Sequence, residues 1–351
     1  MRELNPHWDG DTVFHEARKI VGAEMQHITY THWMEHIIGR KGMKLLGEYQ
    51  GYDAAIEPTI SNVFATAAYR FGHSLINPIL HRLNATFQPI AEGHLPLHKA
   101  FFSPWRIVQE GGIDPLLRGL FATPAKLKMP GQFLNTELTE KLFRAAHEVA
   151  LDLASLNVQR GRDHALRGYT EWRKLCNLSV PENFDELSND MTSSQIRDKL
   201  KQLYGHPGNV DIWVGGLLED PVDGARVGPT FQCLLVEQFK RLRDGDRFWY
   251  ENPSVFTREQ LAQIKQVTLG RVLCDNGDAI TDVTPDVFIL PREQDPAFIP
   301  CDDLPYANLR IWTDCCTDCR NSGNFRRLSS LLAFVSDVRL SLLTSKIEII
   351  L

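Results

Sequence analysis

The chain has 351 residues, of which 43% are hydrophobic and 23% charged, and its formal net charge is −6. This length and composition are ordinary for a globular protein with one large core or two domains. The negative balance excludes a global positive field for nucleic acid or anionic lipid, so binding to either would need a local basic patch.

Two features of the sequence bear on location, and they conflict. No apolar run reaches the ~18 residues of a membrane span. Residues 1–9 lack the apolar segment of a signal peptide, so a product translated from Met1 is expected in the cytoplasm. The glycosylation sequons at Asn84 and Asn177 instead suit a secreted protein.

The first predicted element is a long helix. Apolar residues recur at spacings of three and four from residue 11 to residue 38, with Asp11 or Thr12 as the N-cap and Gly39 as the stop. Residues 39–58 are rich in Gly and Tyr and predict a loop.

A second helix is predicted over residues 60–77 and is ended by Pro78, because a residue before proline is biased out of the helical region. Its apolar stripe would face a core. His73 would lie on the opposite side, beside Arg70, facing either water or a second partner. The polar row that it would share consists of Asn62, Thr66, Tyr69 and Asn77.

The rest of the chain predicts a mainly α fold without internal repeats. Residues 83–130 hold many prolines and glycines and are expected to wrap the core. Periodicity predicts further helices at residues 136–156, 193–204, 229–243 and 257–267. Asn157 and Arg160 would sit at the far end of the first of these. Strand-like alternation is confined to residues 286–290.

Three motifs are the most specific features of the sequence. They are Arg70-Phe-Gly-His73-Ser-Leu-Ile-Asn-Pro, Leu156-Asn157-Val-Gln-Arg160-Gly-Arg-Asp-His164 and Leu242-Arg-Asp-Gly-Asp246-Arg-Phe-Trp-Tyr250-Glu-Asn252. Together they resemble the proximal half of an animal haem peroxidase, and within that family the peroxidasin branch. The resemblance implies a domain at residues 1–323 with the proximal part of that mainly α fold. Residues 324–351 are unlike the family and are expected to form a divergent tail.

The resemblance implies a haem site. In the family one proximal histidine holds the iron, and its second ring nitrogen bonds an asparagine that orients the ring. These roles fall on His73 and Asn157. Arg70 and Arg160 match the arginines that bind the haem propionates, where a planar cationic fork suits a carboxylate.

The resemblance also implies what the matched segment lacks. The family places its distal histidine and arginine, its calcium loop and the acidic residues that esterify the haem upstream of this segment. The distal pair moves the peroxide proton and stabilises developing charge. Peroxidase activity is therefore expected to be lost and any haem to be held weakly. A smaller departure is Ala165, where family members commonly have Gly.

The seven cysteines allow two interpretations. By resemblance, Cys176 would bond Cys233 and Cys274 would bond Cys301, whereas a cytoplasmic setting would keep all seven reduced. The remaining cluster, Cys315-Cys-Thr-Asp-Cys319, resembles half of a zinc site, but no second half follows it.

A rival function follows from His32-Trp-Met-Glu35-His36, which fits the H-x-x-E-H pattern of a zinc hydrolase. Two histidines four apart on one helical face would bind zinc, and the Glu would act as the base. A third ligand is not identifiable from the sequence.

The resemblance adds another alternative, because a short form within the peroxidasin branch is described as a polysome-associated endoribonuclease that cleaves mRNA. Its residue-level support is one basic stretch, half neutralised by Asp244 and Asp246 and composed of Lys240, Arg241, Arg243 and Arg247. The implied partners are thus mRNA and polysomes, or full-length proteins of the peroxidasin type.

Overall fold

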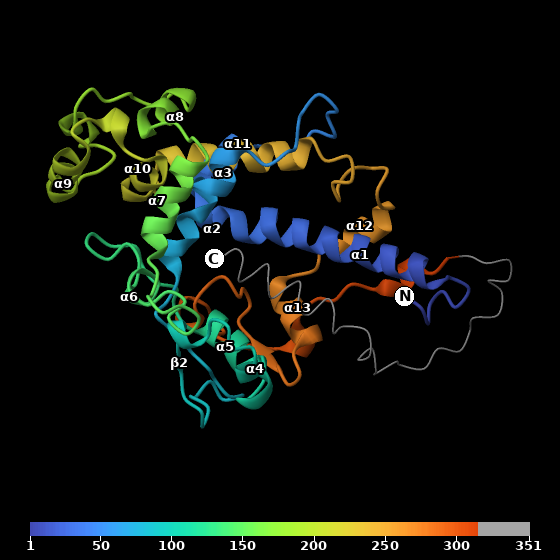
Figure 1. The fold of residues 1–351 in the computed structure, drawn as a ribbon. Coiled ribbons are helices and arrows are strands. Elements are labelled where there is room, and N and C mark those ends of the chain that lie inside the picture. Colours follow the sequence, from blue (N-terminus) through green and yellow to red (C-terminus); the bar gives the residue numbers. More distant parts are fainter. Residues whose placement is uncertain (315–351) are drawn as a thin grey trace.

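The computed structural model describes residues 1–314 and is built mainly from helices (Figure 1), which confirms the mainly α class. The α-helices within these residues are α1 Gly10–His27, α2 Met34–Leu46, α3 Asn62–Thr66, α4 Trp105–Gln109, α5 Asp114–Ala122, α6 Thr136–Thr139, α7 Leu153–Asp163, α8 Tyr169–Leu175, α9 Ser194–Tyr204, α10 Ile212–Leu218, α11 Pro229–Asp244, α12 Arg258–Ile264 and α13 Leu269–Asn276. Two antiparallel pairs of short strands join β1 Ile79–Leu80 to β2 Leu95–Pro96 and β3 Asp282–Val283 to β4 Ile299–Pro300.

The main core lies where α2 packs on α11. Met34 and Ile38 of α2 and Phe231 and Leu235 of α11 are buried in one apolar cluster. Figure 1 shows α3 and α7 standing beside these helices, with α8, α9 and α10 forming a lobe at one end and α4 and α5 lying below. The helices α2 and α11 therefore form the core against which α3 and α7 are positioned.

The first predicted helix is wrong in its start and in its continuity. Asp9 is the N-cap of α1, and its carboxylate accepts a hydrogen bond from the Thr12 amide at 2.7 Å. A π-helix at Ile28–Trp33 separates α1 from α2. The chain then kinks at Gly39, with φ 68°, and stays helical to Leu46. A π-turn holds more than 3.6 residues, so apolar periodicity at 3.6 does not reveal it.

The predicted helix at residues 136–156 is also wrong. Only α6 forms at its start, and Phe143 adopts a φ of 55°, which an α-helix does not contain. Leu142 then pairs with Leu151 across a bridge, and α7 begins after Asp152, whose carboxylate caps the Ala154 amide at 2.8 Å. Leu138 and Leu142, which contribute to the apolar period, are instead buried in a segment of short turns.

Other sequence predictions have mixed outcomes. Helices at residues 193–204 and 229–243 are confirmed as α9 and α11, and the helix that Thr257 was expected to cap is confirmed as α12, with a complete capping box. The predicted strand at residues 286–290 is wrong, because the Asp286 carboxylate accepts from the Phe288 amide at 2.8 Å and bends the chain there.

Within the described residues no helix is long and apolar enough to cross a membrane. The expected boundary at residue 323, the tail and the cysteine cluster at residues 315–319 lie outside the described residues.

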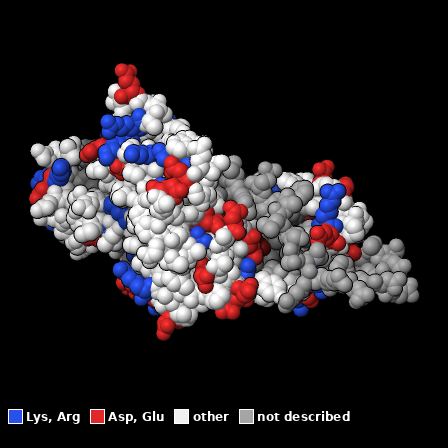
Figure 2. All heavy atoms as spheres, turned by 90° about the horizontal axis from the view of Figure 1, so that it is seen from below, with Lys and Arg blue, Asp and Glu red and all other residues white. Residues whose placement is uncertain are grey.

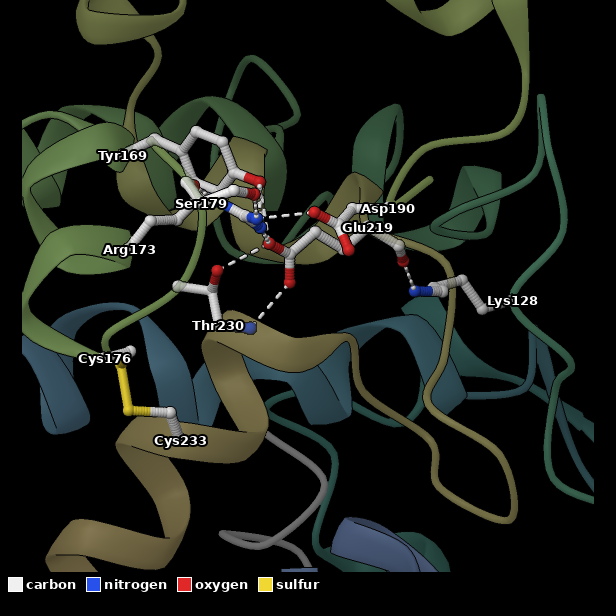
Figure 3. A network of polar contacts seen from close by, with 9 residues as sticks. All are labelled: Lys128, Tyr169, Arg173, Cys176, Ser179, Asp190, Glu219, Thr230 and Cys233. Atoms are coloured by element: carbon white, nitrogen blue, oxygen red, sulfur yellow. Dashed lines mark hydrogen bonds and ion pairs between the residues drawn. A yellow bond between two sulfur atoms is a disulfide. The ribbon is translucent and has the colours of Figure 1, made fainter. Parts of the chain in front are cut away.

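A buried polar network ties the lobe of α8, α9 and α10 to α11 (Figure 3). The Glu219 carboxylate, 0% exposed, accepts from Tyr169 Oη at 2.7 Å, Arg173 Nη1 at 2.7 Å and the Thr230 amide at 2.8 Å. Beside it, Cys176 and Cys233 form a disulfide, and Cys274 and Cys301 form a second one. These are the two pairings that the resemblance implies, and disulfides persist in oxidising compartments.

His27, at the end of α1, is a buried histidine whose Nδ1 lies 3.2 Å from Tyr250 Oη. It lines a cavity of about 200 Å³ together with Glu251 and Lys265. Burial lowers the pKa of His27 to about 4; His32 and Lys265 act in the same direction, and Glu251 opposes them.

The depressed pKa of His27 predicts a loss of stability in acid. Its stabilising contribution is present above the unfolded pKa of about 6.5 and is lost as the pH falls toward 4, because the unfolded chain takes up a proton that the folded chain excludes. We expect His27→Asn to flatten the dependence of the free energy of unfolding on pH in this window. His15→Gln, at an exposed position of the same helix, is the control. An equal slope in both variants, measured by urea unfolding, would contradict this assignment.

Candidate functional site

The segment that carries His73 is not one continuous α-helix. The backbone leaves helical geometry at Ala67, with φ −135° and ψ −63°, and continues as a 3₁₀-helix over Ala68–Leu75. Side chains three apart are eclipsed in a 3₁₀-helix. Arg70 and His73 therefore share one face, which is directed at α7.

Arg70, His73 and Asn157 form a chain of hydrogen bonds at this face. His73 is 2% exposed and Asn157 is 0% exposed. Asn157 Nδ2 lies 2.9 Å from His73 Nδ1, and Arg70 Nη1 donates to Asn157 Oδ1 at 2.8 Å. Arg70 Nε also donates to the Ala65 carbonyl at 3.2 Å. Three residues from two separate motifs thus meet, although 84 positions separate His73 from Asn157.

The predicted polar row divides at Ala67. Asn62 and Thr66, before the break, contact His164: the Asn62 amide donates to the His164 carbonyl at 3.0 Å, and Thr66 Oγ1 lies 3.3 Å from His164 Nδ1. His73, after the break, is buried against α7 and does not face water. Sequence reasoning treated both parts as one row because it assumed a single helical period.

Arg160 lies one turn beyond Asn157, and both residues fall inside α7. The prediction that they lie at the end of a helix over residues 136–156 is therefore wrong. The Arg160 guanidinium is half exposed. Among the described residues its one ion pair is with Asp163 of the same helix, at 3.6 Å. Burial lowers the pKa of Arg70, and the nearby charge of Arg160 lowers it further. Two cations therefore stand near each other beside His73, and the described ion pairs give Arg70 no carboxylate.

Ala165 adopts a φ of 52°, in the left-handed region that favours glycine. It immediately follows His164, whose ring and carbonyl hold Asn62. The Gly that the resemblance leads us to expect at this position would adopt that backbone conformation without strain.

The third motif has a structural role. Gln26 of α1 donates to the Asp246 carboxylate at 3.0 Å and accepts from the Tyr250 amide at 3.0 Å. Trp249 and Tyr250 are buried in the cluster beneath α1. A cavity of about 350 Å³ also lies there and is lined by Gln26, Tyr30, Pro58, Phe239, Leu242, Gly245, Asp246 and Trp249. This region therefore docks α1 on α11 and does not include His73.

The zinc motif does not assemble. His32 lies in the π-helix and His36 in α2, so the helical period changes between them. His36 Nε2 lies 3.8 Å from the Asp286 carboxylate. Across residues 1–314, no group of three or more His, Cys, Asp or Glu side chains is arranged to hold a metal ion.

Three of the four cations in the basic stretch considered for RNA contact protein groups, and the fourth, Arg247, lies over the Phe248 ring at 4.1 Å. Lys240 pairs with Asp244 at 2.9 Å, Arg241 donates to the Glu57 carbonyl at 2.9 Å, and Arg243 donates to the Gly47 carbonyl at 2.6 Å. Figure 2 shows acidic and basic side chains interspersed on one face of the described chain, without a continuous basic surface there.

The fold and the site define a class of protein. The family model for the animal haem peroxidase matches residues 1–288, and the chain belongs to that family. It is 62% identical over 315 residues to peroxidasin of Drosophila melanogaster and 59% identical over 327 residues to the peroxidasin homolog of Homo sapiens. These matches cover 90% and 93% of this chain but 21% and 22% of the two relatives. The chain is therefore similar to about a fifth of each.

A solved structure shows the same architecture. Peroxidase A from Dictyostelium discoideum matches with a TM-score of 0.72 and 32% sequence identity, covering 82% of this chain and 53% of that chain. The fatty acid alpha-dioxygenase of Oryza sativa matches with a TM-score of 0.62 at 17% identity, which shows the fold alone.

Proposed function

We propose that this chain is the haem-holding part of a peroxidasin-like peroxidase domain and that His73 is the proximal iron ligand. The observation that carries the proposal is the hydrogen-bonded chain of His73, Asn157 and Arg70. A metal-binding histidine is oriented through its other ring nitrogen, and Asn157 lies at that nitrogen. Family membership gives haem as the expected cofactor.

The donor set fits haem. A single imidazole is the usual proximal ligand of peroxidases, and the two arginines beside it offer cationic forks to the propionates. When bound, haem would supply the redox chemistry. The protein would hold the iron through His73, keep the ring oriented through Asn157 and neutralise the propionates with Arg70 and Arg160.

Haem titration followed at the Soret band tests this proposal. We expect His73→Ala to weaken binding by at least about tenfold and Asn157→Ala to weaken it by about 10- to 100-fold, as for other residues that orient a metal ligand. Added imidazole should restore the Soret position in His73→Ala. The control is His164→Ala, which removes a neighbouring histidine that contacts Asn62 and Thr66 instead of Asn157. Equal affinity in wild type and His73→Ala would reject His73 as the ligand.

The same preparation tests catalysis. We propose that the 351-residue polypeptide, loaded with haem, turns over peroxide near background. The family places its distal histidine and arginine upstream of the segment matched here, and these two groups contribute about 10²- to 10⁴-fold each in rate. Guaiacol oxidation at the rate of an intact family member would contradict this. Among the described residues no observation favours the zinc or the ribonuclease function, and neither is proposed.

A further inference from the structure

The side-chain amide of Asn157 lies between two groups that determine its orientation. The Arg70 guanidinium carries only donors, so the amide atom that faces Nη1 at 2.8 Å is the oxygen. The amide nitrogen therefore faces His73 Nδ1 at 2.9 Å. An amide nitrogen only donates, so Nδ1 accepts, and the proton of the neutral ring lies on Nε2.

This tautomer is the wrong one for the proximal role. A nitrogen that binds a metal must present its lone pair, so ligation through Nε2 requires the ring proton on Nδ1 and an acceptor opposite it. Asn157 can provide that acceptor only by turning its oxygen toward His73. Arg70 holds the oxygen on the other side.

We propose that Arg70 is a positioning residue that keeps haem-free His73 in the non-binding Nε2–H tautomer through Asn157, an inference that rests on the proposed haem-binding function. If Arg70 moved from Asn157 to an anionic propionate, the amide would be free to rotate and accept from Nδ1–H. One proton then moves from Nε2 to Nδ1 by exchange with solvent, and the charge of the ring does not change. The Nε2 lone pair would thus become available for ligation when a carboxylate arrives.

The surroundings of Arg70 favour such a transfer. Among the described residues its hydrogen-bond partners are two neutral oxygens, of Asn157 and Ala65, and charge-assisted bonds to a carboxylate are about twice as strong as neutral ones. The nearby Arg160 adds repulsion that an anion would relieve. Arg160 also provides a matched control, because it is a cation at the same site for which no bond to Asn157 is seen.

The test reads the tautomer directly. Long-range ¹H–¹⁵N correlation spectra of the ¹⁵N-histidine-labelled, haem-free chain distinguish the two forms, and the His73 signals are those missing from His73→Gln. We expect the Nε2–H form in wild type and in Arg160→Ala, and a mixture of both forms in Arg70→Ala. Asn157→Asp should give the Nδ1–H form, because a carboxylate accepts from both Arg70 and the ring.

An Nδ1–H form in the wild type, or a wild-type pattern in Arg70→Ala, would overturn the proposal. If Asn157→Asp does not fold, as judged by circular dichroism, the comparison of the two arginine variants still decides. Haem titration separates this inference from the proposed function. A chain that shows the expected tautomers but whose haem affinity is unchanged in His73→Ala keeps the Arg70 effect and rejects His73 as the ligand.

Discussion

Replacing Glu219 with alanine is expected to lower the free energy of unfolding by about 3–5 kcal/mol, because several buried donors would lose their acceptor, at a cost of about 1–3 kcal/mol each. Arg173 is 1% exposed and would lose the carboxylate that its Nη1 contacts at 2.7 Å. The Thr230 amide, at the start of α11, would lose its acceptor as well. The guanidinium would keep its Nη2 contact with the Asp190 carboxylate at 2.5 Å, but the Tyr169 hydroxyl and the Thr230 amide would remain inside the protein without their acceptor.

Urea unfolding of the full chain measures this effect, and Glu171→Ala is the matched control. Glu171 also pairs with an arginine, Arg167, but at 3.5 Å and with both side chains exposed, so its loss should change stability by about 0–1 kcal/mol. Similar losses in the two variants would show that the buried network does not stabilise the lobe as inferred.

Gly119→Ala is expected to destabilise the protein by about 3 kcal/mol, at the upper end for overpacking. A Cβ at this position of α5 would lie 1.9 Å from the carbonyl oxygen of His81. That oxygen belongs to the backbone, so α5 and the segment that follows the His73 helix would have to move apart. Thermal unfolding monitored by circular dichroism should show a lower Tm.

The control for this substitution is Gly22→Ala in α1. No atom outside its own helix lies within 4 Å of the added Cβ, and replacing an exposed helical glycine with alanine usually stabilises by about 0.5–1 kcal/mol. A Tm that falls equally in both variants would mean that the close approach at His81 is not the cause.

Motifs predicted more of the candidate site than periodicity did. Arg70, His73 and Asn157 were singled out as members of recognisable motifs, and the structure brings these three side chains together. Periodicity placed His73 in one polar row with Asn62 and Thr66 and left open whether that row faces water or a partner, because one 3.6-residue period was carried across the break at Ala67. The Arg70 contact that orients the amide has no signature in the sequence, since it depends on how α7 packs against the 3₁₀-helix.

The fold was predictable where a helix carries an apolar face and a local start signal, as α9 does with Ser193, α11 with Pro229 and α12 with Thr257. It was not predictable between residues 136 and 156, where leucines spaced like a helix are buried by a turn. Asp152 was the local sign of a new start, since an Asp before an apolar residue is a good N-cap. Glu219 gave no signal, because its burial depends on partners from α8 and α11.

The π-helix at Ile28–Trp33 accommodates one residue more than a regular α-helix would over the same rotation. Because each residue of the wider turn rotates the chain by less than the about 100° of an α-helix, the extra residue is absorbed without turning α2 relative to α1. Met34 and Ile38 therefore stay on α11 while Gln26 stays on Asp246. A homologue with one residue fewer in this segment can form a regular α-helix and keep both contacts, so we expect single-residue deletions to be tolerated here.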